Sequence, residues 1–156
     1  HYWFDDLQKK IKIPIISMPK EVYMHTKKGC KKRSKIGLLA TEGTIRTGVY
    51  SKFFNKNFSL LSPKKSIQIN NVNQAIKFVK MGKIKEAEKA IKPAVNYLIK
   101  MKCKKIVLGC TELPIAIFAY KSFKKIKLSK IFLDPNLILA NIAMKKYKIL
   151  KNKNNY

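Results

Sequence analysis

Apolar and polar positions follow two patterns along this chain. Short apolar runs bounded by turn or polar residues predict strands, and apolar residues that recur every three or four positions predict helices. The predicted strands cover residues 11–16, 36–40, 58–61, 105–108 and 131–133. The predicted helices cover residues 2–10, 19–28, 44–56, 67–80, 84–101, 112–120 and 136–150. Strands that alternate with helices in this way indicate an α/β fold with a mainly parallel sheet.

The segment Val107-Leu-Gly-Cys-Thr-Glu-Leu-Pro114 ends a predicted strand and begins a predicted helix. It would hold the Cys110 thiol at the carboxyl end of a strand, where open α/β sheets bind ligands. Helix N–H groups nearby favour anions, a thiolate included. A lone cysteine is more often a buried packing residue, and the local residues alone leave that reading open.

A second strand-to-helix junction reads Ala40-Thr-Glu-Gly-Thr44. The hydroxyl groups of Thr41 and Thr44, next to Gly43 and a helix start, offer hydrogen-bond donors to a carboxylate. The same pattern also fits a simpler role in which Thr44 caps the helix.

Four segments together resemble the aspartate/glutamate racemase superfamily, in the family's order and at about its spacing. They are Leu108–Pro114, Ile36–Tyr50, Val79–Gly82 and Leu133–Pro135. The glutamate-racemase branch usually has His-Tyr where this chain has Glu112-Leu113, so the sequence favours the aspartate-racemase branch. The resemblance covers nearly all of residues 1–150.

The resemblance implies a Rossmann-like, parallel-sheet racemase domain with remnants of a second, similar domain. Residues 34–130 would form the complete C-terminal domain, 1–33 a remnant of the N-terminal domain, and 131–150 a strand and helix that return to it. Residues 151–156 are expected to be a disordered tail. In the family, a pair like His1-Tyr2 directly follows the first catalytic motif, Cys-Asn-Thr-Ala. The chain therefore reads as a truncated racemase of low activity alone, or as an inactive remnant or one half of a split enzyme.

The resemblance also implies the chemistry. Family members racemise amino acids with two cysteines on opposite faces of Cα, without pyridoxal phosphate or a metal. Cys110 matches the second catalytic cysteine, whose pKa a helix N-terminus or cations can lower. The substrate-binding residues implied are Thr41, Thr44, Lys80, Thr111 and Glu112. Residue chemistry alone leaves Lys80 open as a solvated lysine, Thr111 as a helix cap and Glu112 as a helix N-terminal acid.

The net charge of +27 raises the possibility of a nucleic-acid-binding domain. However, only Arg33 and Arg46 among the 35 basic residues are arginines, the residue best suited to phosphate and base recognition. The lysines are scattered through every segment instead of clustering. A specific nucleic-acid partner is therefore the less favoured hypothesis.

No apolar run approaches the roughly 20 residues that span a bilayer, and no signal peptide pattern is present. Cys30, Cys103 and Cys110 are odd in number and lack metal-ligand spacing, which argues against a disulfide framework or a zinc site. We expect a cytoplasmic protein without a membrane partner. The expected partners are an amino-acid substrate and a complementary N-terminal fragment, with a homodimer if complete, as is common among relatives.

Overall fold

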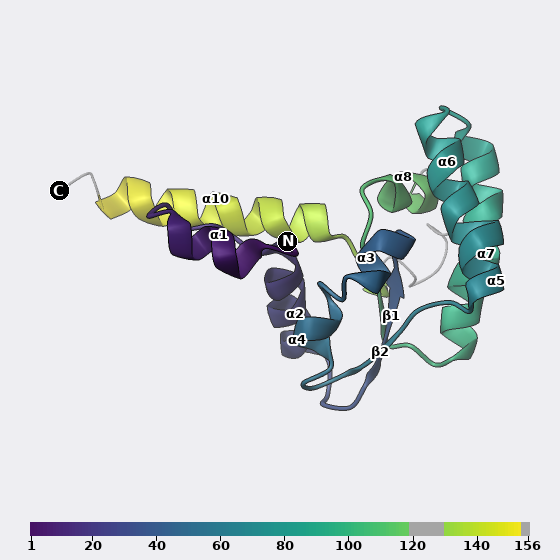
Figure 1. Ribbon diagram of the computed structural model, residues 1–156, viewed down its shortest axis with the longest axis horizontal. Helices are drawn as coiled ribbons and strands as arrows, with labels where there is room; N and C mark the ends of the chain where they lie inside the picture. The colour runs from purple at the N-terminus through teal and green to yellow at the C-terminus, as the bar shows by residue number, and fades with distance from the viewer. Residues whose placement is uncertain (119–129, 154–156) are drawn as a thin grey trace.

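A four-stranded parallel sheet forms the centre of the molecule, as the sequence predicts (Figure 1). The computed structural model describes residues 1–118 and 130–153. Its strands are β1 (Lys35–Leu39), β2 (Ser59–Leu61), β3 (Lys105–Leu108) and β4 (Phe132–Leu133), in the order β2-β1-β3-β4. The apolar runs are buried on both faces, the pattern expected for a sheet covered by helices on both sides.

The strand order places a topological switch point between β1 and β3. The chain leaves β1 toward β2 on one side, and it leaves β3 toward β4 on the other. Crevices at the carboxyl ends of strands at such a point are where open α/β sheets bind ligands. Leu39 pairs with Leu108, so Thr41 and Cys110 each lie two residues beyond paired positions of adjacent strands.

One face of the sheet is covered by the long connection from β2 to β3 and by the helix after β3. These elements are α5 (Lys65–Ile67), the π-helix η1 (Gln68–Asn73), α6 (Gln74–Lys80), α7 (Ile84–Lys100) and α8 (Glu112–Phe118). Their core includes Ile91, Leu98 and Leu113, none of which is exposed to solvent. Figure 1 shows α5, α6, α7 and α8 gathered on this side of the strands.

The other face packs against α2 (Met18–Gly29), α4 (Ser51–Phe54) and the start of α10 (Pro135–Lys153). The short helix α3 (Glu42–Arg46) follows β1 directly. The core of this layer is aromatic, and Tyr50, Phe54 and Phe58 pack around the ring of Tyr23 or one another.

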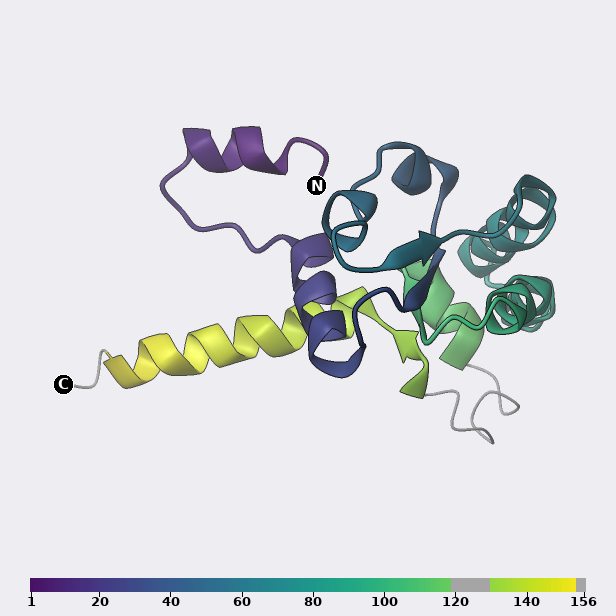
Figure 2. The ribbon, with the colours of Figure 1, turned by 90° about the horizontal axis from the view of Figure 1, so that it is seen from below.

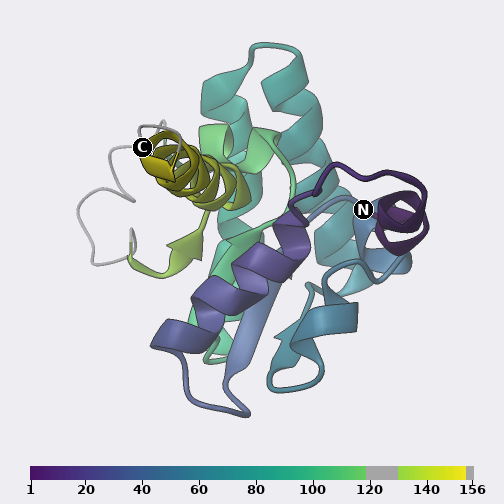
Figure 3. The same ribbon diagram turned by 90° about the vertical axis from the view of Figure 1, so that its left-hand side faces the viewer.

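The terminal helices extend away from this layered body. Helix α1 (Phe4–Lys10) has no buried residue, and α10 projects from the sheet beyond its first turns (Figures 1 and 2). Viewed from that side in Figure 3, α10 points toward the reader while α1 lies apart from it. The exposed apolar side chains of these terminal segments include Tyr2 and Trp3 just before α1, Leu7 in α1, and Leu137, Met144, Tyr147 and Ile149 in α10.

Two predicted elements were wrong. Residues 11–16 form no strand, because the Gln8 amide takes their backbone groups: it donates to the Ile13 carbonyl and accepts from the Ile15 N–H. The predicted helix over 44–56 is split into α3 and α4 at Gly48, whose φ of +66° is a left-handed conformation.

Smaller differences concern the ends of elements. Helix α10 continues to Lys153, so three residues of the predicted disordered tail are helical. Residues 119–129 and 154–156 lie outside the described part of the chain. The predicted end of α8 at Tyr120 and the last three tail residues therefore lie outside it too.

Candidate functional site

Cys110 lies in the short turn between β3 and α8, half-buried at the carboxyl edge of the sheet. The turn stays close to β1 because the Gly109 N–H donates to the Leu39 carbonyl at 2.7 Å. A Cβ at Gly109 would meet side-chain atoms of Ala40, Leu38 and Tyr50 at 3.1–3.2 Å. Glycine before the cysteine thus allows the turn to pack closely on β1 and Tyr50, beside the switch point of the sheet.

The Cys110 thiol donates a hydrogen bond to the Glu112 carboxylate, with Sγ and Oε2 2.8 Å apart. The Thr111 hydroxyl donates to the same oxygen at 3.0 Å. Lys80 Nζ lies 3.8 Å from the other carboxylate oxygen, Oε1. Glu112 thus connects residues from α6 and from the β3–α8 turn in one polar cluster.

The pKa of the Cys110 thiol is raised, whereas the nearby helix start and cations had suggested a lowered pKa. Burial, then the hydrogen bond to Glu112, raise the pKa of Cys110 to about 11, and the nearby Lys80 only partly opposes them. The hydrogen bond from Cys110 lowers the pKa of Glu112. At neutral pH the pair is therefore a protonated thiol beside an ionised carboxylate, because ionising both would place two negative charges in contact.

Lys80 ends α6 and reaches this cluster from the neighbouring helix. Its side chain is 64% exposed, whereas that of Glu112 is 19% exposed. Exposure and the 3.8 Å separation make the ion pair weak, so the ammonium group stays available to a second carboxylate. The structure thus places the Lys80 ammonium group 3.8 Å from the carboxylate that accepts the hydrogen bond of the Cys110 thiol.

Thr41 and Thr44 form the turn after β1. Thr41, not Thr44, is the N-cap of α3, and its Oγ1 accepts from the Thr44 N–H at 3.2 Å. The two hydroxyl oxygens are 2.9 Å apart, so one hydroxyl donates to the other. The second hydroxyl keeps its proton for another acceptor. The helix-capping interpretation and the ligand interpretation are therefore compatible.

Gln68 is a polar residue near the site that the sequence analysis missed. It is 4% exposed, and its Nε2 donates to the Ala40 carbonyl and to Asn73 Oδ1, both at 2.9 Å. Ala40 directly precedes Thr41, so Gln68 joins the turn after β1 to the π-helix that leads to α6. Gln68 lies in a π-helix, and π-helical turns are common at functional sites. This indication of a functional role comes from the structure and could not be read from the sequence.

The remaining cysteines lie away from this cluster. Cys30 and Cys103 are free, and burial raises the pKa of each thiol. Within residues 1–118 and 130–153, no group of three or more His, Cys, Asp or Glu side chains could hold a metal ion. In the same two ranges, no helix is both long and apolar enough to cross a membrane.

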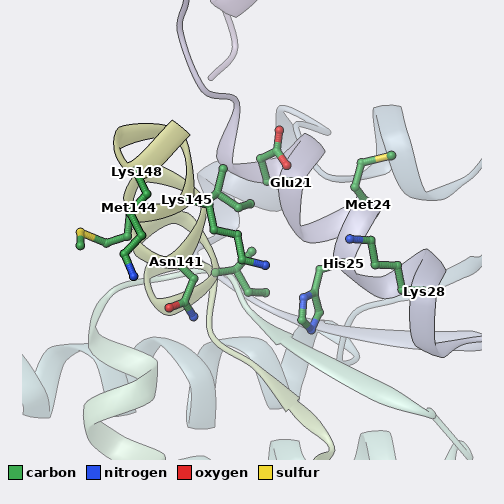
Figure 4. Close-up of a pocket in the computed structure, with 10 residues that line it drawn as sticks. Glu21, Met24, His25, Lys28, Asn141, Met144, Lys145 and Lys148 are labelled. Atoms are coloured by element: carbon green, nitrogen blue, oxygen red, sulfur yellow. The ribbon is translucent and has the colours of Figure 1, made fainter. Parts of the chain in front are cut away.

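A separate pocket of about 460 Å³ lies between α2 and α10, away from Cys110 (Figure 4). His25 and Lys28 reach it from α2, and Lys145 and Lys148 from α10. None of the residues named as candidates from the sequence lines it.

Residues 1–143 match the family model described as Asp/Glu/Hydantoin racemase. The chain is 29% identical over 119 residues to an uncharacterised protein of Pectobacterium carotovorum subsp. carotovorum, covering 74% of this chain and 75% of that protein. It is 27% identical over 126 residues to a glutamate racemase of Carboxydothermus hydrogenoformans, covering 78% of this chain and 44% of the relative.

Among solved structures, the Picrophilus torridus aspartate racemase is similar, with a TM-score of 0.62 and 25% sequence identity. The likeness covers 86% of this chain and 52% of that structure. The chain thus spans about half the length of the two named racemases that it matches, or somewhat less.

Proposed function

The chain belongs to the Asp/Glu/hydantoin racemase family, and from this we propose that it forms part of a cofactor-independent racemase of aspartate or a related acidic amino acid. The Cys110 thiol exchanges the proton on one face of the substrate Cα. A second acid/base group on the opposite face completes the inversion, since racemisation removes a proton from one side and returns one to the other.

The observation that carries this proposal is the register of β1 and β3. The pairing of Leu39 with Leu108 sets Thr41 and Cys110 at equivalent positions beyond two adjacent strands, at the switch point of the sheet. A small substrate held by the threonine hydroxyls would then have its Cα near the thiol. We expect the side chains of Thr41, Thr44 and Cys110 to lie within about 12 Å of one another, the span of a small substrate with a contact at each end.

In the proposed mechanism Cys110 rests as an acid. Its raised pKa keeps the thiol protonated at neutral pH, ready to deliver a proton to a carbanion at Cα. The resulting thiolate, beside the Glu112 carboxylate, is a stronger base than an ordinary cysteine and so takes the proton back in the reverse reaction. Lys80 limits the repulsion between the two anions.

The other side chains bind the substrate. Thr41 and Thr44 donate to the α-carboxylate, and the Thr111 backbone N–H adds a donor from the start of α8. Lys80 pairs with the second carboxylate of an acidic amino acid. The Glu112 carboxylate contacts the ammonium group of the substrate and accepts a hydrogen bond from the Cys110 thiol. The likeness to an aspartate racemase favours aspartate, and the matched glutamate racemase makes glutamate the first competitor to assay.

The second face of the site comes from a racemase domain outside residues 34–130. The exposed apolar side chains of α1 and α10 support this arrangement, because they need a partner surface. In this proposal the parts of residues 1–33 and 131–150 that lie outside the sheet and its core, α1 and the far end of α10, pack on that domain, while α2 and β4 stay with the sheet. The interpretation as one half of a split enzyme predicts the same surface, whereas an inactive remnant would have no partner for it.

The test joins a segment ending in Cys-Asn-Thr-Ala ahead of His1, the order in which the family carries that motif. We expect the joined protein to racemise L-aspartate without pyridoxal phosphate, measured by chiral chromatography. The unjoined chain should show little or no turnover.

The matched control is Cys30→Ala, which removes a thiol far from the cluster and should leave turnover intact. Cys110→Ala should abolish turnover in both directions. Turnover that survives Cys110→Ala would refute the assignment. Strong activity from the 156 residues alone would show that the second proton-transfer group lies within them or comes from another copy.

A further inference from the structure

The amino edge of the sheet, opposite the edge that holds Cys110, gathers basic residues that are spread along the sequence. Because the strands are parallel, the segments that lead into β1, β2 and β3 meet there: residues 30–35, 55–59 and 101–105. They hold eight basic residues among 16 positions and no acidic one, whereas the whole chain has 35 basic residues among 156. In Figure 1 the connections before β1 and β2 lie at the lower end of the sheet, while α3 and α8 lie at its upper end.

Backbone hydrogen bonds hold the three segments side by side. The Arg33 N–H donates to the Asn57 carbonyl at 2.7 Å, and the Lys104 N–H donates to the Lys35 carbonyl at 2.8 Å. The seven exposed basic residues, here called the amino-edge patch, are Lys31, Lys32, Arg33, Lys35, Lys56, Lys102 and Lys104. Within the described part of the chain, none of the seven forms an ion pair with an acidic side chain. The patch therefore presents uncompensated positive charge on a fixed backbone frame.

Two members of the patch have a backbone conformation that long side chains rarely adopt. Arg33 and Lys102 have φ angles of 64° and 63°, and among the described residues they are the only ones other than glycine with positive φ. Lys102 follows the end of α7, and Arg33 is the third residue of a turn that the Ser34 N–H closes by donating to the Lys31 carbonyl. Glycine is the usual residue at both kinds of position. The chain thus keeps two cations where they strain the backbone, which indicates that their charge has a use.

The side chains of the patch define the class of partner. Six of the seven are lysines, which bind phosphate groups as point charges and are poorly suited to reading bases. Residues 30–35, 55–59 and 101–105 contain no exposed large apolar side chain, so the patch has nothing to stack on unpaired bases or to insert into a bilayer. Double-stranded nucleic acid needs neither, and it carries one phosphate charge per roughly 1.7 Å of helix axis.

We propose that the amino-edge patch binds the phosphate backbone of double-stranded nucleic acid, independently of base sequence. A hollow of about 500 Å³, lined in part by Lys32, Arg33 and Lys56, lies between the first two segments and has room for a phosphate group. Each phosphate that a lysine neutralises releases counterions, so the affinity falls steeply as salt is added. The candidate site around Cys110 lies at the opposite edge of the sheet and stays accessible.

The test is a titration of a fluorescently labelled DNA duplex with the 156-residue chain, followed by anisotropy at several salt concentrations. The patch variant combines Lys32→Gln, Lys56→Gln and Lys104→Gln. At about 0.1 M salt it should bind at least about tenfold more weakly than the unsubstituted chain. The slope of log affinity against log salt concentration should shrink by about 2–3, because three phosphate contacts are lost.

The matched control removes the same number of charges outside the patch. It combines Lys64→Gln, Lys85→Gln and Lys89→Gln, which are exposed lysines after β2 and in the first half of α7. It should bind within about twofold of the unsubstituted chain. Equal losses in the two variants would show general attraction to a basic chain and would overturn the proposal. A strong preference between duplexes of unrelated sequence would also overturn it.

A double variant, Arg33→Gly with Lys102→Gly, tests the strained positions by themselves. Glycine accepts both φ angles, so the Tm should not fall, while duplex binding should weaken at least about threefold. Unchanged binding would remove these two cations from the contact surface and contradict the use inferred from their strain. Binding to vesicles of anionic lipid but not to duplex DNA would overturn the choice of partner. Cys110→Ala should bind the duplex normally, so this proposal and the racemase proposal fail separately.

Discussion

In strands β1 and β3 every residue after the first is buried, whereas helix α1 has no buried residue and much of α10 is exposed. Both regions carry large apolar side chains. The difference is that helices on both faces, among them α2, α4, α7, α8 and the start of α10, cover the strands, whereas α1 and the far part of α10 stay exposed. The sheet body therefore completes its own core, and the terminal helices present surface suited to a partner.

This comparison separates two kinds of residue near the candidate site. Gly109, Leu108 and Tyr50 shape the sheet edge through packing, and substitutions there change stability first. Glu112 and Lys80 are partly exposed and adjust the chemistry of Cys110, so substitutions there change reactivity first. The predictions below test that division.

The largest effect is expected for Leu108→Ala in the sheet, compared with Leu137→Ala in α10. Leu108 is fully buried and Leu137 is 61% exposed. Removing the buried side chain should lower the free energy of unfolding by about 2–5 kcal/mol, while the exposed substitution should change it by less than about 0.5 kcal/mol. Urea denaturation of both variants measures the difference. Similar losses would mean that the Leu137 side chain is packed as tightly as that of Leu108.

A smaller loss of stability is expected for Gly37→Ala in β1. A Cβ there would lie 2.8 Å from Leu98 Cδ1 and 3.2 Å from Ile106 Cγ1, in a core where neither neighbour is exposed. We expect a loss of about 1–3 kcal/mol from overpacking. Gly29→Ala, at the end of α2 with nothing within 4 Å of the new Cβ, is the control and should cost nothing measurable. Thermal unfolding of the two variants would contradict the packing account if they melted alike.

The smallest effect concerns Glu112→Gln, which should leave the fold intact and lower the pKa of Cys110. The carboxylate raises that pKa by accepting a hydrogen bond from the thiol and by its negative charge, so the neutral amide favours the thiolate more. At a pH well below a pKa of about 11, the thiolate fraction rises tenfold for each unit by which the pKa falls. Iodoacetamide alkylation of Cys110 at pH 8, followed by peptide mass spectrometry, should therefore be up to about tenfold faster in the variant.

Glu86→Gln is the matched control for that experiment, since Glu86 is an exposed carboxylate in the first turn of α7. Its alkylation rate at Cys110 should equal that of the unsubstituted chain. A slower rate in Glu112→Gln would reverse the sign of the proposed interaction and show that the carboxylate activates the thiol.

The sequence predicted the sheet and most of its helices because each strand is a short apolar run and each helix has a regular apolar face. It failed at residues 11–16, where the Gln8 side chain replaces a neighbouring strand as hydrogen-bond partner. It also failed at Gly48, whose left-handed conformation ends α3 early. One error comes from the hydrogen bonds of a single side chain and the other from the φ angle of a single glycine. The pattern of apolar residues contains information on neither.

For the candidate site, sequence motifs located Cys110, Glu112 and Lys80, which the structure brings into one cluster. The direction in which the Cys110 pKa shifts was not predictable from the motif, since it depends on burial and on which atom accepts the hydrogen bond of the thiol. Gln68 was missed because its importance comes from a hydrogen bond to Ala40, 28 positions away along the chain. Such contacts exist only in the folded molecule.

The most direct test of the central claim is the exchange of the Cα proton of L- and D-aspartate in D2O, followed by proton NMR. The protein is the chain joined to a segment that ends in Cys-Asn-Thr-Ala. Both enantiomers should exchange with the unsubstituted protein. In Cys110→Ala, racemisation should stop and exchange should be lost for one enantiomer only, because the other face keeps its own acid/base group. Undiminished exchange of both enantiomers in Cys110→Ala would contradict the account.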